Sequence, residues 1–368
     1  MNQVIIRDIL SNEISEIIDE IFEKYKIEEK INNKKVLVKP NLLGAFPPER
    51  GVTTDPRLIS EIVKKLKRCK AKEIIVGDNS GSIHFNPLKI AKETGILDAS
   101  GGCLTNIAKE IIEVEVKSRF FNKLFISKVV TEADYIINVP KFKTHSLTTI
   151  TGAVKNMFGI IPGGRKAQLH TLTRSINEFA ELLVDIYQIR IPDINIMDAI
   201  IGMEGIGPTN GKPRIINKII VSDNGISLDS VMAAMMGLKP ESIELLQVAQ
   251  RRNLGEIDLS KINIDGKLEV LSGFKTPNNN LLQKIRKAAV PYIFNFAKVK
   301  PIIDHSKCKQ CHRCIKVCPT SAMTLKNKFP EADRKKCISC FCCEEHCPYG
   351  AIILPSWPVD LYNRLRGK

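Results

Sequence analysis

The residues with the clearest chemistry are cysteines near the end of the chain. The segment "CKQCHRCIKVCP" begins at Cys308 and carries four cysteines separated by two, two and three residues, with a proline after the last. Thiolates at this spacing are typical of iron–sulfur proteins. Zinc also accepts cysteine ligands, but structural zinc sites use cysteine pairs rather than three close cysteines followed by Cys-Pro. The spacing therefore predicts an iron–sulfur centre.

The same spacing occurs again 29 residues later, in "CISCFCCEEHCP". In such duplicated motifs the first three cysteines of one copy bind one cluster and the fourth binds the other. We therefore predict two [4Fe-4S] clusters. The first is assigned to Cys308, Cys311, Cys314 and Cys347, and the second to Cys337, Cys340, Cys343 and Cys318. Cys342 is left over, and we expect it to be a small residue that points away from the clusters.

Residues 301–355 resemble the bacterial two-cluster ferredoxin domain over its whole length. The resemblance implies a small α+β domain that transfers single electrons between two neighbouring clusters. Clusters can also be purely structural, as in some enzymes that act on nucleic acids, but the duplicated form favours electron transfer.

The chain before this domain alternates short apolar runs with amphipathic segments. Strands are predicted at 34–41, 72–77, 133–141, 193–202 and 217–223, and helices at 53–67, 172–188, 228–237 and 240–253. Asp55 and Pro56 are expected to begin the first of these helices, and Asp229 to cap the third. This alternation predicts an α/β fold with a parallel or mixed sheet and flanking helices. We expect this domain at 1–272, a basic helical connector at 273–300 and a tail at 356–368.

The loops that follow predicted strands are polar, and such loops converge at the carboxyl edge of a parallel sheet. The densest of them, residues 138–170, contains no acidic residue. Lysine and arginine beside glycine-rich backbone are typical of sites for phosphate or carboxylate groups. We predict an anion site formed by Lys39, Lys141, Lys143, Lys155, Arg165 and Lys166. His145 or His170 could transfer a proton there, and the acids Asp78 and Asp198 could bind a metal or balance the lysines. The large domain could hold a further, unidentified cofactor.

No Walker sequence is present, and no G-x-G-x-x-G follows the first predicted strand, so no familiar nucleotide site is indicated. The segments "VLVKPNL", "TTDP", "GDNSG", "NVPKFKTHSLTTITGAVKNMFGIIPG" and "SLDSVMAAMMG" are more informative. Together they resemble a prokaryotic family known as domain of unknown function 362, across roughly residues 30–240. The resemblance implies an iron–sulfur or ferredoxin-type protein, and it implies architecture rather than a mechanism.

Three functions remain open. The first is an iron–sulfur oxidoreductase that passes low-potential electrons to an anionic small molecule in the basic crevice. The second is a non-enzymatic carrier or assembly factor that docks an acidic redox partner protein. The third is nucleic-acid binding, which a net charge of +15 would suit but an aromatic content of 6% disfavours. No apolar run reaches the length of a transmembrane helix and no signal peptide is recognisable, so we expect a cytoplasmic protein.

Overall fold

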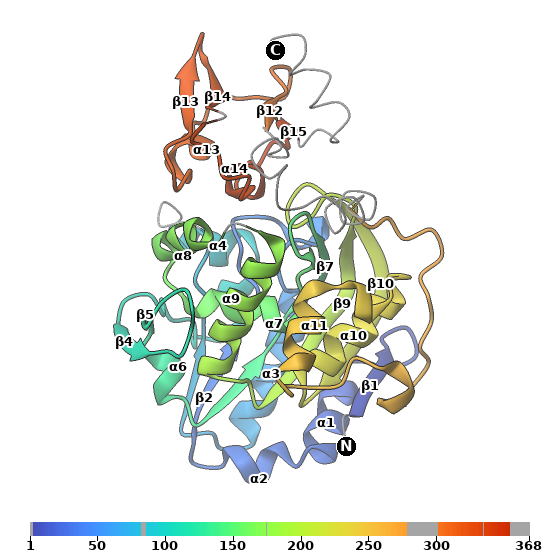
Figure 1. Ribbon diagram of the computed structural model, residues 1–368. Helices are drawn as coiled ribbons and strands as arrows, with labels where there is room; N and C mark the ends of the chain where they lie inside the picture. Colours follow the sequence, from blue (N-terminus) through green and yellow to red (C-terminus); the bar gives the residue numbers. More distant parts are fainter. Residues whose placement is uncertain (1–2, 82–85, 174, 278–300, 334, 354–368) are drawn as a thin grey trace.

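The computed structural model describes residues 3–81, 86–173, 175–277, 301–333 and 335–353, which form a large domain and a small domain (Figure 1). The large domain contains a nine-stranded mixed sheet with helices on both faces, so the predicted α/β class is confirmed. The predicted connector from 278 onward and the predicted tail lie outside the described residues. Residues 273–277 pack on the large domain, where the ring of Phe274 meets that of Phe142 edge to face at 5.9 Å.

The central sheet has a parallel half and an antiparallel half. Its strand order is β11 (Asn263–Asp265), β1 (Gln3–Asp8), β10 (Lys212–Ser222), β9 (Ile194–Glu204), β6 (Tyr135–Asn138), β2 (Lys35–Lys39) and β3 (Glu73–Val76). Strands β9, β6, β2 and β3 are mutually parallel, whereas β10 is antiparallel to both of its neighbours. A further strand, β7 (Lys141–His145), pairs with β9 and with β8 (Thr149–Ile150). The hairpin of β4 (Ile111–Glu115) and β5 (Lys123–Ser127) stands apart from this sheet.

Helices cover both faces of the sheet. Successive side chains of a strand point to opposite faces, so each strand contributes apolar side chains to two cores. Val36 and Val38 of β2 pack into one core and Leu37 into the other. The first core is covered by α1 (Ile14–Lys24), α2 (Ile27–Ile31), α3 (Pro56–Arg68), α4 (Pro87–Glu93) and α5 (Ile96–Ala99). The second is covered by α6 (Val129–Glu132), α7 (Gly152–Asn156), α8 (Gly163–Leu169), α9 (Ile176–Ile189), α10 (Gly225–Met235) and α11 (Glu244–Arg251). The short 3₁₀ turns are Pro48–Arg50, Met157–Ile160, His170–Leu172, Pro240–Ser242 and Leu259–Lys261.

Local signals predicted the start of α3 correctly. The Asp55 side chain accepts a hydrogen bond from the backbone N–H of Arg57, and Pro56 occupies the first helical position. The prediction for Asp229 was wrong. Helix α10 begins earlier, with Asn224 as its cap, and Asp229 lies in the helix interior. Its buried carboxylate instead accepts hydrogen bonds from the first backbone N–H groups of α7, at Ala153 and Val154.

The Asp229 carboxyl gives a testable dependence of stability on pH. Burial raises its pKa from 3.8 to about 7, although the two backbone donors oppose this shift. The folded protein thus favours the protonated acid, and this contribution is complete below about pH 4 and is lost as pH rises to about 7. The shift corresponds to about 4 kcal/mol.

Replacing Asp229 by asparagine removes this titration. Relative to the wild type, the urea midpoint of D229N is expected to rise between about pH 4 and about pH 7 and then to change little. The variant Asp223→Asn, which alters an exposed carboxyl nearby in the chain, is the control and should follow the wild type. Parallel curves for wild type and D229N would contradict the prediction.

The two halves of the small domain have similar backbone conformations. It contains β12 (Ile302–Ile303) paired with β15 (Ile352–Ile353), β13 (Met323–Lys326) paired with β14 (Phe329–Ala332), and the helices α13 (Arg313–Lys316) and α14 (Cys342–Glu345). Residues 29 positions apart share positive φ angles: Gln310 and Ser339, His312 and Phe341, and Ser321 and Gly350. The duplication seen in the cysteine spacing is therefore also present in the backbone.

Within the described residues, no helix combines the length and the apolar character needed to span a membrane.

Candidate iron–sulfur centres and the cavity between the domains

The cysteines of the small domain line two separate small cavities. One cavity is lined by Cys308, Cys311, Cys314 and Cys347. The other is lined by Cys318, Cys337, Cys340 and Cys343, together with Cys342. Each cavity thus combines three cysteines of one motif with the fourth cysteine of the other, which is the grouping predicted from the spacing.

Burial and the crowding of cysteines both raise the pKa values of these thiols. The pKa of Cys314 is raised to about 12, first by burial and then by the neighbouring Cys347, Cys311 and Cys308. The pKa of Cys343 is also raised, first by burial and then by Cys340, Cys337, Cys314 and Cys318. Cysteines crowded in this way ionise together only when cations lie among them, and iron ions would supply that charge. The donor set therefore fits an iron–sulfur cluster in each cavity.

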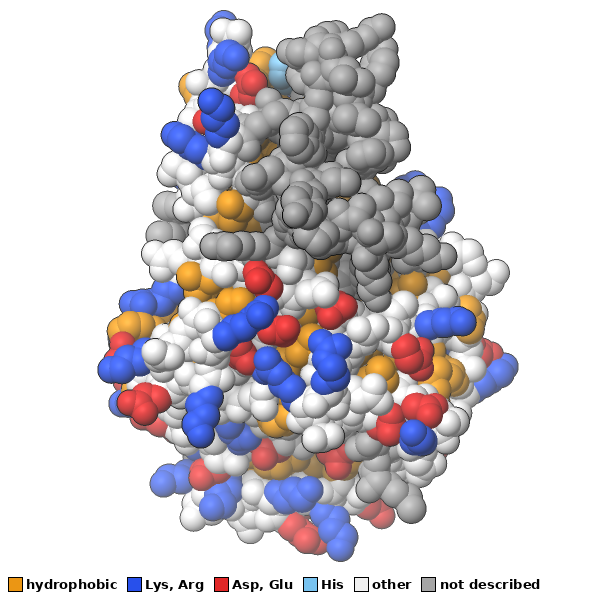
Figure 2. Space-filling model, in the orientation of Figure 1, with side chains coloured by type: hydrophobic (Ala, Val, Ile, Leu, Met, Phe, Trp, Pro, Cys, Tyr) orange, Lys and Arg blue, Asp and Glu red, His pale blue; other side chains and the backbone are white. Residues whose placement is uncertain are grey.

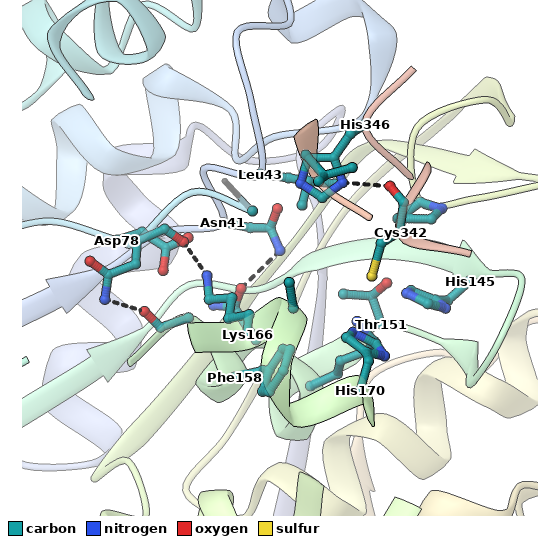
Figure 3. A pocket seen from close by; sticks show the side chains of 18 of the residues that line it. Asn41, Leu43, Asp78, His145, Thr151, Phe158, Lys166, His170, Cys342 and His346 are labelled. Atoms are coloured by element: carbon teal, nitrogen blue, oxygen red, sulfur yellow. Dashed lines mark hydrogen bonds between the residues drawn. The ribbon is translucent and has the colours of Figure 1, made fainter. Parts of the chain in front are cut away.

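A larger cavity of about 280 Å³ lies between the two domains (Figure 3). The large domain contributes residues that follow β2 and β3 and residues from the 138–170 stretch. The small domain contributes the end of α13, Cys318 and Pro319, Cys342 at the start of α14 and His346 just after that helix. The cavity therefore borders the polar carboxyl edge of the sheet on one side and a cluster cysteine on the other.

Three of the lysines predicted to bind an anion line this cavity. Lys143 donates to the Asn41 Oδ1 at 3.0 Å and to the backbone oxygen of Val52 at 2.8 Å. Lys166 donates to the backbone oxygens of Asn79 at 2.5 Å and Ser80 at 3.0 Å. Lys155 lies half-buried with its ammonium 5.8 Å from the ring centre of Phe158.

The three other predicted cations lie elsewhere. Lys39 and Lys141 are buried and form ion pairs of 2.7 Å, with Asp78 and Asp198 respectively. Burial lowers the pKa of Lys39, and the Asp78 carboxylate partly offsets this effect. The Arg165 guanidinium stacks 3.9 Å from the ring centre of Phe125. These side chains do not line the cavity, so their predicted contact with an anion is not supported by the geometry.

Both candidate histidines line the cavity. The Nδ1 of His145 accepts hydrogen bonds from the backbone N–H groups of Leu147 at 3.0 Å and Thr148 at 3.3 Å. In a neutral ring this arrangement leaves the proton on Nε2. His170 stacks on Phe179 with the ring centres 4.4 Å apart. His145 is thus held by two backbone hydrogen bonds, and His170 packs against the ring of Phe179.

A chain of buried amides supports the cavity floor, and the sequence did not reveal it. Asn41 donates to Asn156, Asn156 donates to Asn138, and Asn138 donates to Asn195, at 2.9, 2.7 and 2.9 Å. Buried networks of this kind fix side-chain positions when every member is paired. Since Lys143 donates to the first amide, the network links a cavity lysine to the centre of the sheet. These asparagines are scattered along the chain, and only the fold shows that they meet.

Specific contacts hold the small domain over the cavity. The Asn210 side-chain amide donates to the carboxylate of Glu344 at 2.7 Å and to its backbone oxygen at 3.2 Å. His346 packs against Gly81 so closely that a Cβ at Gly81 would lie 2.5 Å from the imidazole Nε2. Cys342, predicted from the sequence to point away from the clusters, lines both the second cysteine cavity and the cavity between the domains.

Comparison with known families agrees with this architecture. The model described as domain of unknown function (DUF362) matches residues 36–234, which is more than half of the chain. The chain belongs to the DUF362 family. A second model, described as 4Fe-4S dicluster domain, matches residues 300–348, so this DUF362 member is fused to an iron–sulfur domain. Iron–sulfur electron transfer is therefore supported by the small domain.

One curated relative is Thylakoid-associated protein sll1697 of Synechocystis sp.. It is 32% identical over 232 residues, which cover 60% of this chain and 68% of the relative. No solved structure matches this DUF362 chain.

Proposed function

We propose that this protein is an iron–sulfur oxidoreductase that exchanges low-potential electrons between its two clusters and an anionic substrate or cofactor in the cavity between the domains. The observation that carries the proposal is that one cavity is bounded by Cys318 on one side and by Lys143, Lys155 and Lys166 on the other. Covalent attachment of the two domains keeps the electron path short and removes the need for a diffusional encounter.

The cavity residues have separate roles in this proposal. Lys143, Lys155 and Lys166 attract and orient the anionic groups of the ligand. His145 transfers a proton through Nε2, because its Nδ1 is occupied by two backbone donors. His170 is the alternative proton donor. The clusters supply single electrons.

The burial of the basic stretch supports this function over docking of an acidic partner by the large domain. Lys143 is 1% exposed and Lys166 is 8% exposed, so neither forms part of an open, flat surface. Figure 2 also shows acidic and basic side chains interspersed on the visible face of the large domain. A continuous basic track for nucleic acid would instead concentrate one sign of charge.

We propose a cytoplasmic location, where a reducing environment keeps cysteines available as cluster ligands. The name of the relative associates that protein with the thylakoid. Fractionation of cells distinguishes a cytoplasmic protein from one that is held at a membrane surface.

A native mass spectrum of the anaerobically purified protein tests the proposal. The expected spectrum contains the mass of two clusters and of one further anionic molecule. Lys155→Gln should retain both clusters and lose the extra molecule, whereas the exposed control Lys72→Gln should keep it. Clusters without a further molecule, together with capture of an acidic protein, would favour the carrier function. Zinc in place of the clusters would contradict a redox role.

A further inference from the structure

The two cluster sites are not equivalent with respect to the cavity between the domains. We call the cavity lined by Cys308, Cys311, Cys314 and Cys347 the Cys308 site, and the one lined by Cys318, Cys337, Cys340 and Cys343 the Cys318 site. The Cys318 site shares Cys318, Pro319 and Cys342 with the lining of the cavity between the domains. The Cys308 site shares none of its lining residues with it. Electron transfer is favoured over short gaps, so the cluster at the Cys318 site is the better placed of the two to serve a ligand in the cavity.

Contacts between the two domains keep the Cys318 site next to the cavity. Glu344, which pairs with Asn210, and His346, which packs against Gly81, both lie in or just after α14, the helix that begins at Cys342. The wall formed by Cys318 and Cys342 is thus fixed over the cavity by the same segment that carries Cys343.

The Cys308 site has the features of a protein docking surface. Cys311 is exposed, and Tyr349, which lines the same site, is 47% exposed. The exposed Lys309 and the partly exposed Arg313 line this site as well. An apolar centre with a basic rim suits a redox protein with acidic residues around its own cofactor.

We propose that the two clusters are ordered: the Cys308 cluster exchanges electrons with an acidic electron-carrier protein at the surface around Lys309 and Tyr349, and the Cys318 cluster exchanges them with the cavity. The transfer of electrons to a ligand in the cavity rests on the proposed function. The positions of the two cluster sites do not depend on a ligand. One electron passes at each step, from carrier to Cys308 cluster to Cys318 cluster or in the reverse direction, and no bond is formed in the polypeptide.

Charge-reversal variants test the order in the intact holoprotein. A negative charge near a cluster disfavours its reduced state and lowers its reduction potential. In a redox titration followed by electron paramagnetic resonance, Lys155→Glu should lower the potential of one cluster, and Lys309→Glu that of the other. Lys30→Glu in α2, at the far end of the large domain (Figure 1), is the matched control and should shift neither. Shifts of the same cluster by both variants would overturn the proposal.

Reduction kinetics test the docking surface, with an acidic [2Fe-2S] ferredoxin as the probe. At low salt, Lys309→Glu should slow the first electron transfer by at least about tenfold, because steering by opposite charges is lost. Lys30→Glu should leave this rate unchanged. Slowing by Lys155→Glu alone would overturn the assignment. These measurements need no ligand in the cavity. The cluster order can therefore be confirmed even if the cavity binds no anion, and it can be contradicted even if the native mass spectrum shows a bound anion.

Discussion

Replacing Cys308 and Cys347 together by alanine is expected to remove one cluster, whereas replacing Cys308 and Cys318 together is expected to remove both. The reason is the crossed lining of the two cysteine cavities, in which Cys347 joins Cys308 and Cys318 joins the second motif. The first variant should therefore retain about half of the iron and sulfide of the wild type, and the second almost none. Chemical analysis of iron and sulfide in anaerobically purified protein measures the difference.

This comparison separates crossed from self-contained motifs. If each motif held its own cluster, the pair Cys308 and Cys318 would cost only one cluster and the pair Cys308 and Cys347 would cost both, which is the opposite result. Cys342→Ala is the control, because Cys342 lies beside the ligands without belonging to the predicted set. It should keep its full iron content, and a loss of iron from this variant would mean that the ligand assignment is wrong.

The iron–sulfur domain was predictable from the sequence because its information is local. The two motifs contain the cysteine spacing and its repeat, from which the grouping of ligands is predicted, between Cys308 and Cys347. The start of α3 was equally local, since Asp55 and Pro56 adjoin the turn that they stabilise. In both cases the residues that determine the local structure lie within a few positions of it in the sequence.

The cavity depends on contacts between distant segments, and this limits prediction. The stretch at 141–145 was interpreted as a polar loop because of its lysines, yet it forms β7, in which every residue is buried. A buried lysine is tolerated only with a partner, and Asp198 comes from another strand 57 residues away. The absence of nearby acids in the sequence therefore did not leave the charge of Lys141 uncompensated in the fold.

The misassigned Asp229 has the same physical cause. Its position near the start of a predicted helix suggested a local cap, but its acceptors serve α7, which lies far away in the sequence. Gly152 begins α7 with a φ of +54° and lies against this carboxylate, where a Cβ would overlap it. The residues next to Asp229 in the sequence give no sign of its contact with α7, and the residues next to Gly152 give no sign of a contact with Asp229.

Replacing Asp198 by alanine is expected to destabilise the large domain by about 3–5 kcal/mol, because it leaves the Lys141 ammonium buried without its counterion. Lys141 is 1% exposed and Asp198 is fully buried, and their charged atoms are 2.7 Å apart. The same carboxylate accepts hydrogen bonds from the backbone N–H groups of Asp55 at 2.6 Å and Ile200 at 3.0 Å. Its removal therefore also leaves two donors without their acceptor.

The midpoint of urea unfolding, measured with the clusters intact, tests this expectation. Glu132→Ala is the control, because the ion pairs of Glu132 with Lys35 and Lys128 lie at the surface and are screened by solvent, so this variant should shift the midpoint far less than Asp198→Ala. The double variant Lys141→Met with Asp198→Asn should recover most of the stability, because it removes both charges and keeps an acceptor for the backbone.

The same variants decide whether Lys141 stabilises the fold or binds the ligand. As half of a buried ion pair, Lys141 should affect stability, and the double variant should still carry the extra anionic molecule in its native mass spectrum. If the double variant were stable but had lost that molecule, Lys141 would belong to the anion site that the sequence predicted. Retention would leave Lys143, Lys155 and Lys166 as the cations of the cavity, since the charge of Lys141 would then serve only to hold β7 against β9, where it positions Lys143 and His145.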